Sequence, residues 1–225
     1  MQITSGSVAD VILVMAKAVP GAEHRGMSIF LVPTTVDGFS ATAIDNKIGI
    51  RTSDLTEIAL DDVRLPAENL VGRSDRGFFQ LIEFFPSARV NVAAQTVGVS
   101  QAAIDDAIDY ANEREQGDQP TLEFQAVGHM LAEIATRTEA ARSLTYWAAP
   151  MLGDDDRAAV NRLASMAKFF ASERAVDDTD DALQVFGSAG YVSDHPGERY
   201  YRVARITKIY DCASEIQNNV ITDQP

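Results

Sequence analysis

The chain has 225 residues, 46% of them hydrophobic, so it can bury a sizeable core as one large domain or two small ones. Its 33 Asp and Glu against 19 Lys and Arg give a net charge of -14, which excludes the basic surface that a nucleic-acid-binding protein needs. Ten Phe and six Tyr, together with the hydrophobic fraction, argue against disorder. The acids include 21 Asp and the bases only four Lys, a composition typical of proteins adapted to strong salt; an acidic mesophilic surface is the alternative.

One cysteine, Cys212, excludes an intramolecular disulfide and a cysteine-cluster metal site. The histidines are scattered without the spacing of metal ligands, so no metal site is expected. No charged-then-apolar leader opens the chain, and no apolar run is long enough to cross a bilayer. We therefore expect a cytoplasmic location without membrane insertion.

The first third of the chain has the pattern of β-strands. Short apolar runs at residues 11–15 and 28–32 are bounded by turn residues, and residues 56–60 follow with partial alternation. Pro33 and the Asp37-Gly38 pair mark turns between them. This portion is predicted to be antiparallel β-structure.

Beyond residue 75 the apolar spacing becomes helical. A first helix is predicted from Phe78 to about Asn112, bent or interrupted near its start by Pro86. A second helix is predicted over residues 121–149, ended by Pro150 and Gly153, and three aspartates at 154–156 suit the start of a third. That third helix should stop at residues 187–190, and a last helical stretch from about Glu198 should be interrupted near Asp211.

Long helices with short connections favour an antiparallel bundle. The predicted fold class is therefore α+β. A partial antiparallel β domain over residues 1–75 is followed by a C-terminal up-down four-helix bundle over residues 76–225.

Three stretches carry more specific information, at residues 47–72, 184–199 and 209–217. Residues 47–57 are K-I-G-I-R-T-S-D-L-T-E, and residues 61–72 are D-D-V-R-L-P-A-E-N-L-V-G. Residues 184–191 are Q-V-F-G-S-A-G-Y, with P-G-E-R at 196–199, and residues 209–217 are I-Y-D-C-A-S-E-I-Q. In order and spacing these resemble the K-x-G-x-R-x-S, Q-x-x-G-G-x-G-Y and I-Y-E-G-T-x-E-I-Q patterns of FAD-dependent acyl-CoA dehydrogenases. The resemblance covers essentially all 225 residues.

The resemblance implies α,β-dehydrogenation of an acyl-CoA thioester, in which a carboxylate removes the α-proton and the β-hydride passes to FAD. The family's catalytic Glu falls on Asp211, which is one methylene shorter, and a substrate-side arginine falls on Arg89. Some members carry the base on the residue before that arginine, but Ala88 stands there. A structural role for Asp211, as the N-cap of a last helix starting at Cys212, stays open beside the catalytic one.

The resemblance also implies contacts to FAD. Arg114 falls on a pyrophosphate contact made across a subunit interface, and Thr4, in a Q-I-T-S-G sequence similar to the family's W-I-T-N-G, on a hydroxyl beside the flavin. Further positions that match cofactor contacts are Gln184, Gly187, Ser188 and Glu215. For Arg114 the alternative is a solvated arginine, and for Thr4 it is a plain turn. For Gln184, Gly187 and Ser188 it is a helix C-cap, and for Glu215 a surface carboxylate.

Several positions depart from the family pattern. Gln2 replaces the tryptophan that packs on the flavin, Ser188 replaces a glycine, and Ala213 replaces a threonine that hydrogen-bonds the cofactor. Nothing in the chain matches the family's N-terminal helical domain or its C-x-T-E-P-x-x-G-S-D strand.

Two functional hypotheses follow. In one, the chain is a component of a working dehydrogenase, with acyl-CoA as substrate and electron-transfer flavoprotein as electron acceptor. It would then act as a homo-oligomer (dimer or tetramer) or with a separate N-terminal chain. In the other, it is a flavin-free remnant that retains the bundle as an interaction or oligomerisation module.

Overall fold

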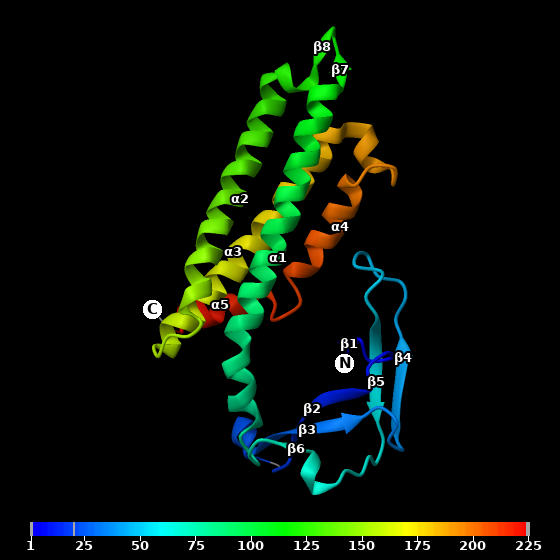
Figure 1. Cartoon of the computed structure of the whole chain (residues 1–225), viewed down its shortest axis with the longest axis vertical. Coiled ribbons are helices and arrows are strands. Elements are labelled where there is room, and N and C mark those ends of the chain that lie inside the picture. Colours follow the sequence, from blue (N-terminus) through cyan, green and yellow to red (C-terminus); the bar gives the residue numbers. More distant parts are fainter. Residues whose placement is uncertain (1, 20, 224–225) are drawn as a thin grey trace. The chain divides into compact units, whose positions relative to one another are not determined.

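The computed structural model describes residues 2–19 and 21–223. The chain divides into two compact units, Met1–Phe84 and Phe85–Pro225. All the longer strands lie in the first unit, whereas the second is almost entirely helical (Figure 1). Helix α1 (Gly77–Glu113) begins in the first unit and continues through the second.

The β unit contains two small antiparallel sheets. One has the strand order β1-β5-β4 and the other β2-β3-β6. The bounds are β1 Gln2–Thr4, β2 Val11–Lys17, β3 Met27–Pro33, β4 Phe39–Ala43, β5 Leu55–Leu60 and β6 Leu70–Val71. Short 3-10 turns, η1 (Glu23–Gly26) and η2 (Ala67–Asn69), precede β3 and β6.

Strand β2 forms an edge of its sheet. It pairs with β3 along its whole length, from Val11 opposite Pro33 to Lys17 opposite Met27, and β3 pairs in turn with β6. Among the described residues no further strand pairs with β2. Its side chains alternate, and Val11, Leu13 and Met15 are exposed. The open edge therefore carries apolar side chains.

The two units together confirm the predicted α+β fold class, and the helical unit is the predicted four-helix bundle. Helix α2 (Gln125–Met151) and helix α3 (Arg157–Phe186) lie alongside α1, and the last bundle segment is divided into α4 (Gly197–Thr207) and α5 (Ser214–Thr222) (Figure 1). A short hairpin of β7 (Glu115–Gln116) and β8 (Gln119–Pro120), followed by the 3-10 turn η3 (Thr121–Glu123), connects α1 with α2. The 3-10 turn η4 (Gly187–Tyr191) follows α3.

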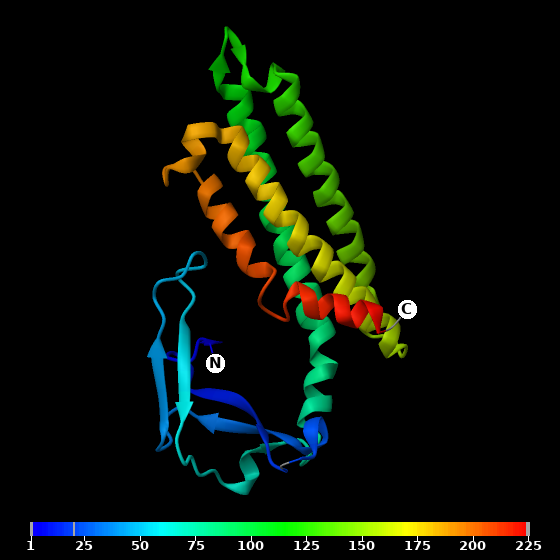
Figure 2. The same cartoon turned by 180° about the vertical axis from the view of Figure 1, so that it is seen from behind.

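Helix α3 packs against α2 along one side and against α4 and α5 along others (Figure 2). Small residues make these close approaches possible, because alanine side chains leave room for a neighbouring backbone. The fully buried alanines of α3 are Ala164, Ala167, Ala171, Ala175 and Ala182. Two hydrophobic clusters formed by α1, α2 and α3 fill the interior.

Two prolines were expected to affect helices, Pro86 near the start of the first helix and Pro150 at the end of the second. Pro86 lies within α1, and Pro150 lies within the last turn of α2, which ends one residue later at Met151. The predicted end of the second helix at Pro150 and Gly153 is therefore confirmed, whereas Pro86 does not interrupt α1 although it removes one backbone donor. The expected start of α3 is confirmed, because the Asp156 carboxylate caps it by accepting a hydrogen bond from the Ala159 amide at 3.0 Å.

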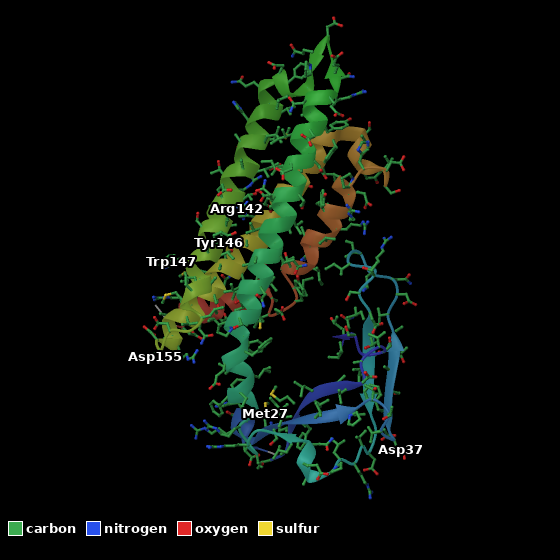
Figure 3. The ribbon with its side chains drawn as sticks, viewed as in Figure 1. Met27, Asp37, Arg142, Tyr146, Trp147 and Asp155 are labelled. Atoms are coloured by element: carbon green, nitrogen blue, oxygen red, sulfur yellow. The ribbon has the colours of Figure 1, made fainter. Side chains whose placement is uncertain are left out.

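The outward face of α2 carries two exposed aromatic side chains, Tyr146 and Trp147 (Figure 3). None of the helices in the described part of the chain is both long and apolar enough to cross a bilayer.

The bundle core predicts a matched pair of stability effects. Val160 of α3 is 2% exposed, whereas Val192, after η4, is 48% exposed. We expect Val160→Ala to lower the free energy of unfolding by about 2 kcal/mol, since two buried methyl groups and a residual cavity are involved. Val192→Ala should change it by less than about 0.5 kcal/mol. Urea denaturation followed by circular dichroism measures both, and equal effects would contradict the assigned burial.

Candidate active site

The loop between α4 and α5 carries the proposed catalytic carboxylate in an unusual backbone conformation. Asp211 has φ 49° and Cys212 has φ 77°, so two consecutive non-glycine residues occupy the left-handed region. Helix α5 begins at Ser214 with Ala213 as its N-cap residue, and no side chain caps it. The prediction that Asp211 caps a helix starting at Cys212 is therefore wrong. The left-handed turn delays the helix by two residues and leaves the Asp211 side chain exposed.

Two buried side chains hold the carbonyl groups of this loop. Lys168 Nζ donates to the Cys212 carbonyl at 2.7 Å. Gln217 Nε2 lies 3.1 Å from the same oxygen and 3.3 Å from the Asp211 carbonyl. Both side chains are 0% exposed. The backbone closes the loop further, because the Ser214 amide donates to the Lys208 carbonyl at 3.1 Å.

The charges around the loop shift several pKa values. Burial lowers the pKa of Lys168 to about 8, against the opposing influence of Cys212, Asp211 and Glu173. Burial by itself raises the pKa of Glu173, but hydrogen bonds from Lys208 and Ser214 outweigh it, so this pKa lies below its ordinary value. The Lys208 ammonium is 2.6 Å from Glu173 and the Ser214 hydroxyl 2.7 Å from it. Glu173 is thus an ionised anchor for both ends of the loop.

Tyr210, next to Asp211, is bound to α1 through its side chain. Its hydroxyl donates to the Gln95 amide oxygen. Burial and then the nearby Asp211 carboxylate raise the pKa of Tyr210, while the bond to Gln95 lowers it. The phenol is consequently neutral at physiological pH and serves as a hydrogen-bond donor.

Arg89, the expected substrate-side residue, lies inside the helical unit. Its side chain is buried, Nη1 donates to Asn161 Oδ1 at 3.3 Å, and the guanidinium lies 5.6 Å from the centre of the Phe85 ring. Its Nε is buried without a hydrogen-bond partner among the described residues. Arg89 also contributes to lowering the pKa of Lys168, which places its charge near the anchor of the loop.

Three of the expected cofactor residues come together after α3. Gln184, Gly187 and Ser188 are all exposed, and they line an open depression of about 340 Å³ together with Asp180, Leu183 and Tyr191. Gly187 is the C-cap of α3 with φ 58°, which confirms the helix C-cap reading and requires a conformation that other residues rarely adopt. A side chain built there meets no atom within 4 Å, so the depression is open above it.

The remaining expected residues lie on other elements. Arg114 is exposed just after α1, and its amide and carbonyl are bonded to Tyr110 and Thr121. The hairpin beside it and η4 lie toward the same end of the bundle (Figure 1). Glu215 is exposed in the first turn of α5. Thr4 is exposed at the end of β1 in the β unit, where a turn follows with Ser5 at φ 64°.

Sequence reasoning assigned no role to Lys168 or Gln217. A signal for Lys168 was present, because it follows Ala164 by four residues and precedes Ala171 by three. It therefore lies on the apolar side of its helix, where a lysine is unexpected. Gln217 belongs to the motif at 209–217, but the sequence does not indicate which atoms its side chain binds.

Comparison with known proteins agrees with the fold and the motifs. The model of the acyl-CoA dehydrogenase C-terminal domain matches residues 75–224, and that of the middle domain matches residues 1–63. The cyclohexane-1-carbonyl-CoA dehydrogenase of Geobacter metallireducens is 39% identical over 97% of this chain and 57% of its own length. The mitochondrial short-chain specific acyl-CoA dehydrogenase of Sus scrofa is 38% identical over 97% of this chain and 53% of its own length.

Solved structures give the same result. Butyryl-CoA dehydrogenase from Megasphaera elsdenii has a TM-score of 0.92 at 34% identity, covering 98% of this chain and 57% of its own. A chain from the structure of the electron transferring flavoprotein of Acidaminococcus fermentans has a TM-score of 0.92 at 38% identity. The match covers 97% of this chain and 57% of that chain. The protein belongs to the acyl-CoA dehydrogenase family, whose members are FAD-dependent oxidoreductases. It spans little more than half the length of these relatives.

The depressed pKa of Lys168 predicts a pH-dependent stability. Between pH 8, the approximate folded value, and 10.5, the ordinary one, the unfolded chain binds more protons at this site than the folded chain. Stability therefore rises with pH across that window. Relative to Lys168→Met, the wild-type free energy of unfolding should increase by on the order of 3 kcal/mol from pH 7.5 to 10.5.

Urea titrations at these two pH values, followed through the helical circular dichroism, measure the difference. Lys17 is exposed, so Lys17→Met is the matched control and should retain the wild-type pH dependence. A pH-independent difference between wild type and Lys168→Met would show that Lys168 titrates normally in the folded chain.

Proposed function

We propose that this chain provides the catalytic base and part of the cofactor site of an FAD-dependent acyl-CoA dehydrogenase. In this reaction the Asp211 carboxylate removes the α-proton of an acyl-CoA thioester. FAD, when bound, accepts the hydride from the β-carbon. The proposal rests on the family membership and on the match of Asp211 to the family's catalytic position.

The geometry of Asp211 is the observation that carries the proposal. A base for a weakly acidic C–H must be accessible and held in position. The Asp211 side chain is exposed, while its backbone is fixed in a left-handed turn by buried donors from α3 and α5. Asp211 and Cys212 are two consecutive left-handed residues held by buried donors, and strained positions of this kind cluster at functional sites.

The residues present fit part of a flavin dinucleotide. Gln184, Gly187 and Ser188 gather at one open depression, where an amide and a glycine suit contacts to the adenosine half. Arg114 is exposed and would bind the pyrophosphate through its guanidinium fork. Thr4 would supply a hydroxyl beside the flavin ring. Ala213 contributes no hydroxyl, so Glu215 and the backbone are the remaining donors and acceptors on that side.

We further propose acyl-CoA as the substrate and electron-transfer flavoprotein as the electron acceptor. Support for the first comes from the relatives named for acyl-CoA substrates, and for the second from the similarity to a chain in the Acidaminococcus structure. Because the chain spans about 57% of the Megasphaera enzyme, acyl-CoA oxidation is expected in the presence of the N-terminal part that this chain does not cover.

Flavin binding is the direct test of the cofactor assignment. The purified chain, combined with the N-terminal part of the Megasphaera enzyme, should bind FAD and show flavin absorbance after gel filtration. Arg114→Ala should weaken FAD binding by about 10–100-fold, since a charge-assisted bidentate contact to the pyrophosphate is lost. Arg64 is an exposed arginine of the β unit, so Arg64→Ala is the control and should leave FAD affinity unchanged. A colourless protein that still oligomerises would instead support an interaction module.

Substitutions at Asp211 test the base. Restoring the family residue with Asp211→Glu advances the carboxylate by about 1.5 Å and should raise kcat roughly 10–100-fold, because misplacement by about 1 Å can cost that much. Asp211→Asn removes the base and should lower kcat at least 100-fold. Dye-linked oxidation of butyryl-CoA by the FAD-loaded assembly measures both. If Asp211→Asn retained wild-type turnover, the base would be another group.

A further inference from the structure

Lys168 is a fully buried cation on a helix face made mostly of small apolar residues. Its side chain is 0% exposed, and Ala164, Ala167 and Ala171 of the same helix are buried with it. Burying an ammonium group is unfavourable by several kcal/mol unless hydrogen bonds compensate, and a methionine would fill a similar volume without that penalty. The presence of a lysine rather than an apolar residue at position 168 therefore needs a structural explanation.

The atom that this donor binds lies in a strained part of the helical unit. Nζ donates at 2.7 Å to the carbonyl of Cys212, the second of two consecutive residues with positive φ. Such residues are disfavoured by about 1 kcal/mol or more each and persist only where neighbouring groups fix them. A charge-assisted hydrogen bond is the stronger of the two side-chain contacts at that oxygen, because Gln217 offers a neutral amide at 3.1 Å.

We propose that Lys168 is a positioning residue whose hydrogen bond to the Cys212 carbonyl holds residues 210–213 in the turn that presents the Asp211 carboxylate. The catalytic consequence of this positioning rests on the proposed function, whereas the positioning itself does not.

The titratable groups around Lys168 come from three elements and favour this role. Asp211 and Cys212 face it from the loop, Glu173 lies on its own helix, and Arg89 approaches from α1. Glu173 is already paired with Lys208 and with the Ser214 hydroxyl. The Lys168 ammonium thus remains directed at the loop rather than forming an ion pair with Glu173.

The single cysteine of the chain reports on the loop without any engineered label. Cys212 is partly buried, and its own carbonyl accepts the hydrogen bond in question. Alkylation of native protein with iodoacetamide at pH 7, quantified by mass spectrometry, measures how often the loop opens. We expect Lys168→Met to increase the alkylation rate about tenfold, as the loss of a charge-assisted hydrogen bond implies.

The direction of the change tests the positioning role. Release of the loop makes the partly buried Cys212 thiol more accessible and accelerates alkylation. A loop that stays in its turn after the hydrogen bond is lost leaves the alkylation rate unchanged.

Ser172→Ala is the matched control. Ser172 is also a fully buried donor on α3, and its hydroxyl donates at 3.0 Å to the Thr207 carbonyl, before the loop begins. Its removal should leave the alkylation rate within about twofold of wild type. An increase of threefold or more for Lys168→Met, with none for Ser172→Ala, supports the proposal. A smaller increase, a decrease, or equal increases in both variants overturns it.

Circular dichroism at the assay temperature verifies that each variant is folded. If Lys168→Met loses its helical signal, Lys168→Gln, which keeps a polar group in the site, replaces it with the same thresholds. The measurement requires neither FAD nor acyl-CoA. Faster alkylation, together with an assembly with the N-terminal part that binds no flavin, would sustain the positioning role while refuting the proposed function. In an active assembly, Lys168→Met should lower kcat and leave the KM for butyryl-CoA within about twofold.

Discussion

Close packing around α3 is the constraint on which the helical unit depends. A helix that contacts α2, α4 and α5 can approach them only where its own side chains are small, and five fully buried alanines satisfy that condition. The same closeness excludes water, so any polar group on α3 that faces a neighbour must find its hydrogen-bond partner within the protein.

Three polar residues of α3 meet this requirement by binding the C-terminal segment. Lys168, Ser172 and Glu173 follow one another along the helix, and together they bind groups of Thr207, Lys208, Cys212 and Ser214. A regular helix thereby determines the path of an irregular loop, because residues four apart lie on one face at a fixed spacing. The position of the Asp211 carboxylate is consequently set by side chains of another helix, 38 to 43 residues earlier in the chain.

Much of the architecture could be predicted from the sequence, because hydrophobic periodicity and capping residues are local signals. The three long helices, the Asp156 cap and the Gly187 C-cap follow from such signals. Pro86 was misleading, because α1 continues through it although a proline disfavours helix locally. Helix capping was one of two roles considered for Asp211, and it is excluded by the left-handed backbone of Asp211 and Cys212, which no sequence pattern indicates. The role of Lys168 could not be predicted either, because its bond to Cys212 joins residues 44 apart.

The open edge of β2 has a consequence for any study of the protein in solution. Among the residues that the structure describes, no strand pairs with its outer side, and the exposed Val11, Leu13 and Met15 give that edge the character of a template for another strand. Native proteins usually cover such an edge or place charges on it, and here a lysine is present only at the end, at Lys17. The edge of β2 is thus a place where a further polypeptide strand would find unpaired backbone groups and apolar side chains together.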